Sequence, residues 1–202
     1  MKTISGMILI LLLVFIMFGG VSCLLEDKVI EIVLTGTTCA DFHEDEDSEN
    51  FTTPKTVNYG EEIEDILADN DISRDDIVSA VVVGGSYTVT AFSHTHDWTC
   101  SGEITVRRDA GADATLIEYT SLSILATLGV SVTADLEPGG VAILDQALQD
   151  FLGGANPVLT FTVVSETGDV DPDPSPSDPM VFDWKACITI HVTMDEEFEG
   201  PA

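Results

Sequence analysis

Residues 180–194, MVFDWKACITIHVTM, show the strongest pattern in this 202-residue chain. Apolar side chains occupy every second position of the stretch, namely Met180, Phe182, Trp184, Ala186, Ile188, Ile190, Val192 and Met194. The positions between them are mostly polar, as Asp183, Lys185 and His191 illustrate. A helix cannot place alternate residues on one side, whereas a strand must. The stretch is therefore predicted to form a long, half-buried strand, or two strands joined by a bulge.

The same alternation recurs between residues 121 and 136, where the apolar set is Leu122, Ile124, Ala126, Leu128, Val130, Val132, Ala134 and Leu136. Two such runs favour antiparallel sheets with one wetted face. Shorter strands are predicted at 29–34, 77–83, 87–92, 103–107 and 158–164. Gly84 and Gly85 separate two of these strands, either as a tight turn or as a bulge in one longer strand.

Two short accessory helices are predicted between the strands. Asn58 is expected to cap the first helix, which ends by about Asn70. The second runs from about Gly140 to Leu152 with an apolar stripe on one face, and Gly153 ends it. The predicted fold is mainly β, an antiparallel β-sandwich of about seven strands with these two helices.

Residues 23–202 are predicted to fold as one acidic domain, because this length suffices for a core that does not depend on disulfides. Within it, the segment 168–179, GDVDPDPSPSDP, is rich in proline and acid. Such a composition is typical of an exposed, extended loop.

The chain has 36 acidic and 7 basic residues, a formal net charge of -29. Nucleic acid is excluded as a partner, because its phosphates would be repelled and no basic stripe is present. Anionic lipid surfaces are disfavoured too, which leaves a covalent acyl anchor for membrane attachment. The acidity indicates either a self-repelling soluble surface or calcium sites. The acidic segment 43–50, HEDEDSEN, lacks the glycine of a calcium loop and is predicted to be an exposed loop.

Residues 1–23, MKTISGMILILLLVFIMFGGVSC, combine Lys2 with an apolar run from Ile8 to Phe18 and small residues before a cysteine. The apolar run has the length of a signal-peptide core and is too short for a comfortable membrane span. Residues 1–22 are therefore predicted to be a signal peptide that directs export.

The segment 19–23, GGVSC, resembles the lipobox of bacterial lipoproteins, in which cleavage precedes a cysteine that carries diacylglycerol. Gly20 stands where lipoboxes usually have leucine. The resemblance implies lipidation of Cys23 with acyl chains such as palmitate. Because Leu24, and not aspartate, follows the cysteine, it also implies an outer-membrane or cell-surface location. Two alternatives stay open: an uncleaved signal anchor, and cleavage that leaves Cys23 unmodified.

With Cys23 acylated, Cys39, Cys100 and Cys187 remain. An exported chain normally oxidises one pair from such a set. The pairing predicted here is Cys100 with Cys187, which would close a long loop. The alternative is that all three are small buried side chains that never meet.

His94 and His96 in the sequence SHTHDW are the strongest candidates for chemistry. Two residues apart on a strand, their imidazoles would point the same way and could begin a zinc site. Cys100, Cys187 and His191 are the candidate further ligands, although export favours a disulfide for the cysteines. No nucleophile motif, phosphate-binding loop or two-histidine helix motif is present.

These observations favour a membrane-tethered binding or structural module that contacts protein or glycan through its loops. Trp98 and Trp184 are expected to be core or rim aromatics, although a tryptophan on an exposed loop could stack on sugar. No enzymatic activity, cofactor or metal is predicted, and the oligomeric state is left undetermined. Two alternatives come from other classes: a metal-dependent exported enzyme that uses His94 and His96, and a calcium-stabilised adhesion module.

Overall fold

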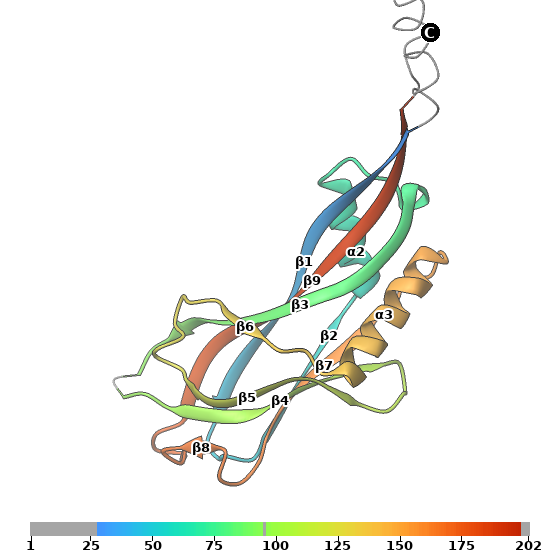
Figure 1. Ribbon diagram of the computed structural model, residues 1–202. Coiled ribbons are helices and arrows are strands. Elements are labelled where there is room, and N and C mark those ends of the chain that lie inside the picture. Colours follow the sequence, from blue (N-terminus) through green and yellow to red (C-terminus); the bar gives the residue numbers. More distant parts are fainter. Residues whose placement is uncertain (1–27, 95, 199–202) are drawn as a thin grey trace, which may run out of the picture. The chain divides into compact units, whose positions relative to one another are not determined.

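The computed structural model describes residues 28–94 and 96–198 (Figure 1). These residues form the strands β1 (Lys28–Glu46), β2 (Phe51–Val57), β3 (Ile77–Phe92), β4 (Thr99–Arg108), β5 (Ala114–Ser123), β6 (Val132–Ala134), β7 (Leu159–Ser165), β8 (Val170–Asp171) and β9 (Met180–Phe198). The helices are α2 (Tyr59–Ala68), α3 (Pro138–Leu152) and the short 3-10 helix η1 (Arg74–Asp76). Val33–Thr193 is one compact unit, and the second unit consists of Met1–Ile32 and Met194–Ala202. The predicted signal peptide and Cys23 lie outside the described residues.

The strands of Val33–Thr193 form two sheets, one in the order β1-β9-β3-β6 and the other in the order β2-β7-β4-β5, with β8 paired to β4. The pairings of β2 with β7, β3 with β6, and β4 with β5, β7 and β8 are all antiparallel. The β1–β9 pair is antiparallel as well, because Cys39 is bonded to Cys187 while His43 contacts Asp183. The predicted antiparallel β-sandwich with two accessory helices is confirmed, with more strands than expected.

The stretch 180–194 lies within the single strand β9, as predicted. Its alternate apolar side chains are buried, and Trp184 is at the centre of the core. The Trp184 ring centroid lies 5.4 Å from that of Phe42 in β1 and 5.8 Å from that of Tyr119 in β5. Because β1 and β5 belong to different sheets, this aromatic cluster joins the two layers of the sandwich.

The predicted strand between residues 121 and 136 is wrong over most of its length. Only its two ends are strands, in β5 and β6, and residues 124–131 form the turn between them. The Asp97 carboxylate accepts a hydrogen bond from the Ser123 hydroxyl, and the Thr127 hydroxyl donates to the Ser123 carbonyl at 2.8 Å. Hydroxyls that were expected to face water on a strand instead close a turn, because they bond to nearby backbone.

Strand β3 runs without interruption through Gly84 and Gly85, so the alternative of one longer strand is correct. Before the glycines Ala80 faces the core, and after them Tyr87 and Val89 do. The alternation therefore shifts by one residue at the glycine pair, as a bulge requires. Gly85 also allows a close approach, since an added Cβ would lie 2.6 Å from Leu136 Cδ2.

Helix α2 packs on the inner face of the β1-β9-β3 sheet, whereas α3 lies beside β3 and packs on β5 and β4 of the other sheet (Figure 1). Helix α2 begins after Asn58, whose Oδ1 accepts a hydrogen bond from the N–H of the third residue on at 3.3 Å. Its Ile66 side chain lies over Gly36 of β1, where an added Cβ would be 2.6 Å from Cγ2. On α3, Asp145 Oδ1 accepts a hydrogen bond from the Val82 N–H of β3 at 3.1 Å. No helix in the described ranges has the length and apolar character needed to cross a membrane.

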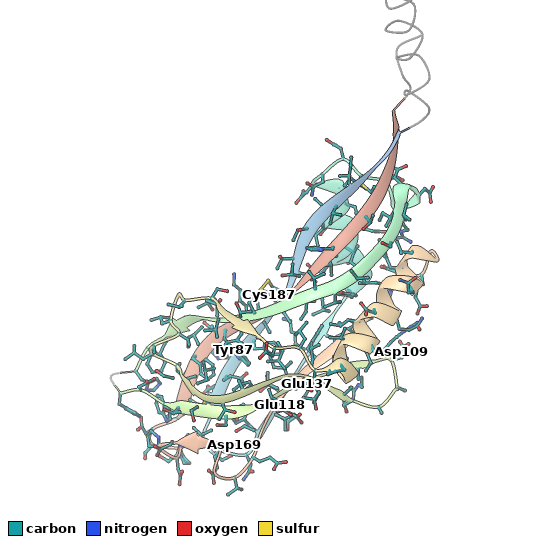
Figure 2. The ribbon with its side chains drawn as sticks, viewed as in Figure 1. Tyr87, Asp109, Glu118, Glu137, Asp169 and Cys187 are labelled. Carbon is teal, nitrogen blue, oxygen red and sulfur yellow. A yellow bond between two sulfur atoms is a disulfide. The ribbon has the colours of Figure 1, made fainter. Side chains whose placement is uncertain are left out.

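A disulfide joins Cys39 of β1 to Cys187 of β9, with an S–S distance of 2.09 Å. The predicted Cys100–Cys187 pair is therefore wrong. Cys100 is free and buried in β4, with its Sγ 3.4 Å from Met180 Sδ. The prediction failed because the first strand was expected to end at residue 34, which hid the fact that Cys39 lies beside β9. Cys187 is labelled in Figure 2.

The acidic segment 168–179 is mostly exposed, although Val170 and Pro174 are buried. Val170 and Asp171 form β8, which pairs with the first two residues of β4. The segment thus has one anchored point on the sandwich and then continues to β9.

Candidate functional site

The two histidines lie in the connection between β3 and β4, at one end of the sandwich. Their nearest ionic neighbour is Asp178, which lies 4.0 Å from His94 Nδ1 and 3.5 Å from His96 Nε2. Both rings pack on Trp98, with centroid distances of 4.7 Å for His94 and 4.1 Å for His96. The structure therefore brings the histidines together with one carboxylate over a buried indole.

The other residues considered as zinc ligands do not join this pair. Cys100 contacts Met180, Cys187 is in the disulfide, and His191 lies further along β9. Among the residues that the structure describes, no group of three or more His, Cys, Asp or Glu side chains is placed to hold a metal ion. The geometry therefore gives no support to the metal-dependent alternative.

Neither tryptophan is available for stacking on a sugar. Trp98 is 0% exposed and Trp184 is 2% exposed. A ring that binds a pyranose must present its face to solvent. Both tryptophans are core aromatics, as expected, and the alternative of sugar stacking on an exposed loop does not apply to them.

Sequence reasoning missed a buried carboxyl at Glu44, which belongs to β1 and not to an exposed loop. Glu44 is 0% exposed and accepts two hydrogen bonds, from Trp184 Nε1 at 2.9 Å and from Thr53 Oγ1 at 2.6 Å. Burial raises the pKa of this carboxyl, and the two hydrogen bonds oppose the rise. The alternation of β1 is the signal that could have found it, because Ala40, Phe42 and Glu44 share one face.

Two further titratable groups lie in the same interior. Burial raises the pKa of Cys100 to about 12, and the charge of Glu44 contributes to this rise. Burial likewise raises the pKa of the Tyr119 phenol. A thiol and a phenol that stay protonated at neutral pH are poor nucleophiles, so we assign this cluster a structural role.

A groove of about 500 Å³ opens beside β1, β2, β3 and β9, and it is lined by Asp41, Phe42, His43, Thr53, Pro54, Lys55, Thr90, Asp183 and Trp184. His43 Nδ1 lies 2.6 Å from Asp183 Oδ1, and this contact raises the pKa of His43. Acidic and basic groups are both present, so the groove does not select a ligand of one charge.

The outward side of the β1-β9-β3 sheet has a different composition from the rest of the chain. The strand segments 33–39, 77–83 and 187–193 read VLTGTTC, IVSAVVV and CITIHVT, without Asp, Glu, Lys or Arg. We call the outward side of these three segments the neutral face.

Helix α2 lies on the opposite side of the sheet and leaves the neutral face open. Thr35 and Thr37 are exposed, whereas the intervening Gly36 is buried under α2. On β3, Val81 and Val83 are 46% and 45% exposed. On β1, Val33 is 50% exposed. The Cys39–Cys187 disulfide borders the neutral face, and charged side chains begin beyond it.

No family model and no curated protein matches this chain. Among solved structures, the decameric BFDV capsid protein is similar with a TM-score of 0.35 and 11% sequence identity, over 81% of this chain and 99% of that chain. The structure of Desmodium yellow mottle tymovirus is similar with a TM-score of 0.27 and 10% identity, over 88% of this chain and 93% of that chain. At these TM-scores neither structure contributes to a functional assignment.

Proposed function

We propose that this chain is an exported, lipid-anchored surface protein that acts as a binding or structural module and contacts protein through its neutral face. The observation that supports the proposal is the exposure of Val33, Val81 and Val83 on a sheet face without carboxylates, in a chain of net charge -29. Exposed apolar side chains grouped on one face are typical of protein contact surfaces. The burial of both tryptophans favours protein over glycan as the ligand.

The anchor is tested by the intact mass of the chain extracted from the membrane fraction. The expected species begins at Cys23 and is heavier than the unmodified polypeptide by its acyl chains. A species that retains Met1 would refute lipidation and favour a signal anchor. An unmodified chain that begins at Cys23 would leave export correct and the anchor wrong.

Display at the surface is tested by adding a protease to intact cells. The chain should be degraded in intact cells, with an inner-compartment protein as the protected control. Protection of this chain until the cells are lysed would contradict outward display.

A further inference from the structure

We infer that the neutral face is the contact surface for a second copy of this chain, in a two-fold symmetric dimer. The inference deepens the function proposed above and rests on it. Exposure of the neutral face does not by itself say which protein binds there, and this inference names that protein.

The excess of acidic residues disfavours most surfaces of the chain as contacts between two copies. Acidic residues outnumber basic ones 36 to 7, so two copies that meet through most surfaces bring carboxylates together. On α2 alone, Glu61, Glu62, Glu64 and Asp65 follow within five residues. Like charges placed against each other across an interface cost several kcal/mol. Two copies that meet through their neutral faces encounter no such repulsion. The uncharged stretch 119–134, with exposed Leu125, Leu128 and Val130, would avoid it too, but much of it is a turn and not the sheet face that stacking requires.

A two-fold axis places the neutral face of one copy against the neutral face of the other. In a two-fold dimer the identical patch is used by both copies, so each patch must suit itself in charge and shape. A strongly charged partner would find no opposite charge among 33–39, 77–83 and 187–193. An uncharged sheet face that presents valines and threonines finds a matching surface in a second uncharged sheet face, stacked as in a sandwich at a spacing of about 10 Å.

The dimensions of the face predict a weak dimer. Strand segments of this length extend about 20 Å, and three strands side by side cover about 14 Å, which gives a footprint of about 300 Å². Stable interfaces bury about 800 Å² of accessible surface on each partner, so this contact belongs to the small class. A lipid anchor compensates for the small area, because confinement of both copies to one membrane raises their effective concentration.

The experiment uses the full chain in its native membranes with a bifunctional maleimide cross-linker. His191→Cys places a thiol on β9, the middle strand of the neutral face, where the two copies come closest. The wild-type chain is the background control: its Cys39 and Cys187 are bonded and Cys100 is buried, and any cross-link through an unmodified Cys23 appears in this control. Val158→Cys is the matched control, because Val158 is 41% exposed and lies outside the neutral face.

We expect a cross-linked species at twice the chain mass for His191→Cys and none for Val158→Cys or wild type. Adding Val81→Asp to His191→Cys should lower its yield at least tenfold, because two carboxylates would then meet across the interface. Adding Val158→Asp should leave the yield unchanged. Raising the salt concentration should increase it, since salt screens the repulsion between the two acidic copies.

Three outcomes would overturn the inference. Equal yields from the two cysteine variants would show that the neutral face is not the contact. A cross-link to a protein of different mass would refute the second copy while leaving the proposed binding module intact. Absence of any cross-link would refute both the dimer and the proposal that the neutral face contacts protein. Thr37→Cys, on the exposed side of β1, gives the same test if His191→Cys fails to fold.

Discussion

Replacing Glu44 by glutamine should make this protein more stable than wild type at neutral pH, with an advantage that shrinks as the pH falls. The reason is that Glu44 is buried at the contact between β1 and Trp184, with a raised pKa. A carboxyl whose pKa is raised on folding stabilises the folded state below its unfolded pKa, near 4.3. This stabilisation is lost as the pH rises through the folded pKa. Glutamine does not titrate and escapes the loss.

The structure sets the size of the effect. Glutamine keeps both contacts of Glu44, because its oxygen accepts from the Trp184 N–H and its amide donates to the Thr53 hydroxyl. At acidic pH the two proteins should therefore agree within about 1 kcal/mol. At higher pH the variant should unfold with a larger free energy than wild type. Each tenfold rise in the proton affinity of Glu44 on folding adds about 1.4 kcal/mol to this difference. Glu44→Ala should instead be destabilised by about 1–3 kcal/mol or more, because the Trp184 N–H is left without a partner.

Urea unfolding followed by tryptophan fluorescence provides the assay. Measurements should run from about pH 5 to about pH 8, above the isoelectric point of ≈ 4.1. Glu118→Gln is the control, because it removes the same charge from an exposed position of β5 (Figure 2). Its difference from wild type reports what removal of one carboxylate does without burial of that carboxylate. A difference for Glu44→Gln that is flat with pH would refute the reasoning, since it would mean that folding does not change the proton affinity of Glu44.

Three more predictions concern packing and cysteine chemistry. The double change Cys39→Ala and Cys187→Ala should lower the free energy of unfolding by about 5 kcal/mol, since the bond spans 148 residues of the unfolded chain. Peptide mapping without reductant should recover these two cysteines linked, and a link from Cys187 to Cys100 would contradict the structure. Gly140→Ala should destabilise by about 1–3 kcal/mol, because its Cβ would lie 2.6 Å from a backbone atom of β5. Gly139→Ala should raise the free energy of unfolding by up to about 1 kcal/mol, because its Cβ would lie at an ordinary contact distance of 3.6 Å from its nearest neighbour. Equal denaturation midpoints for Gly140→Ala and Gly139→Ala would show that α3 does not pack on β5. The Cys100 thiol, with its pKa raised to about 12, should resist iodoacetamide until the protein unfolds, and fast native labelling would disprove its burial.

Patterns within one segment predicted the elements that local physics controls. The alternation at 180–194 identified β9, and the Asn58 cap and the apolar stripe at 140–152 located α2 and α3. In each case the hydrophobic period alone identifies the element type, and for α2 the Asn58 cap marks its start as well, so no distant contact is needed to decide the structure.

The errors occurred where a distant residue decides the local structure. The alternation at 121–136 is broken by Asp97, whose carboxylate binds the turn from another segment. Strand β2 was missed because Pro54 argues against a strand, yet proline is tolerated at a sheet edge, where β2 lies. The extension of β1 was missed because its next core-facing positions are Gly36 and Thr38, which interrupt the apolar pattern although both are buried.

The contact surface could not have been proposed from the sequence. Segments 33–39, 77–83 and 187–193 are individually ordinary strands, and only the strand order β1-β9-β3 makes them neighbours. The histidine pair shows the reverse case. His94 and His96 are close in sequence and in space, but no third metal ligand meets them in the described residues.

The position of β9 between β1 and β3 has a consequence for biogenesis. Of the described strands, β9 is the latest in sequence, and it must insert between two strands made much earlier. Until it arrives, β1 and β3 have no partner on the sides that will face it, and this sheet cannot assemble. Such non-local pairing is slow. A nascent chain therefore cannot complete this sheet until β9 has been made, and truncation before β9 would leave two unpaired strand edges exposed to aggregation.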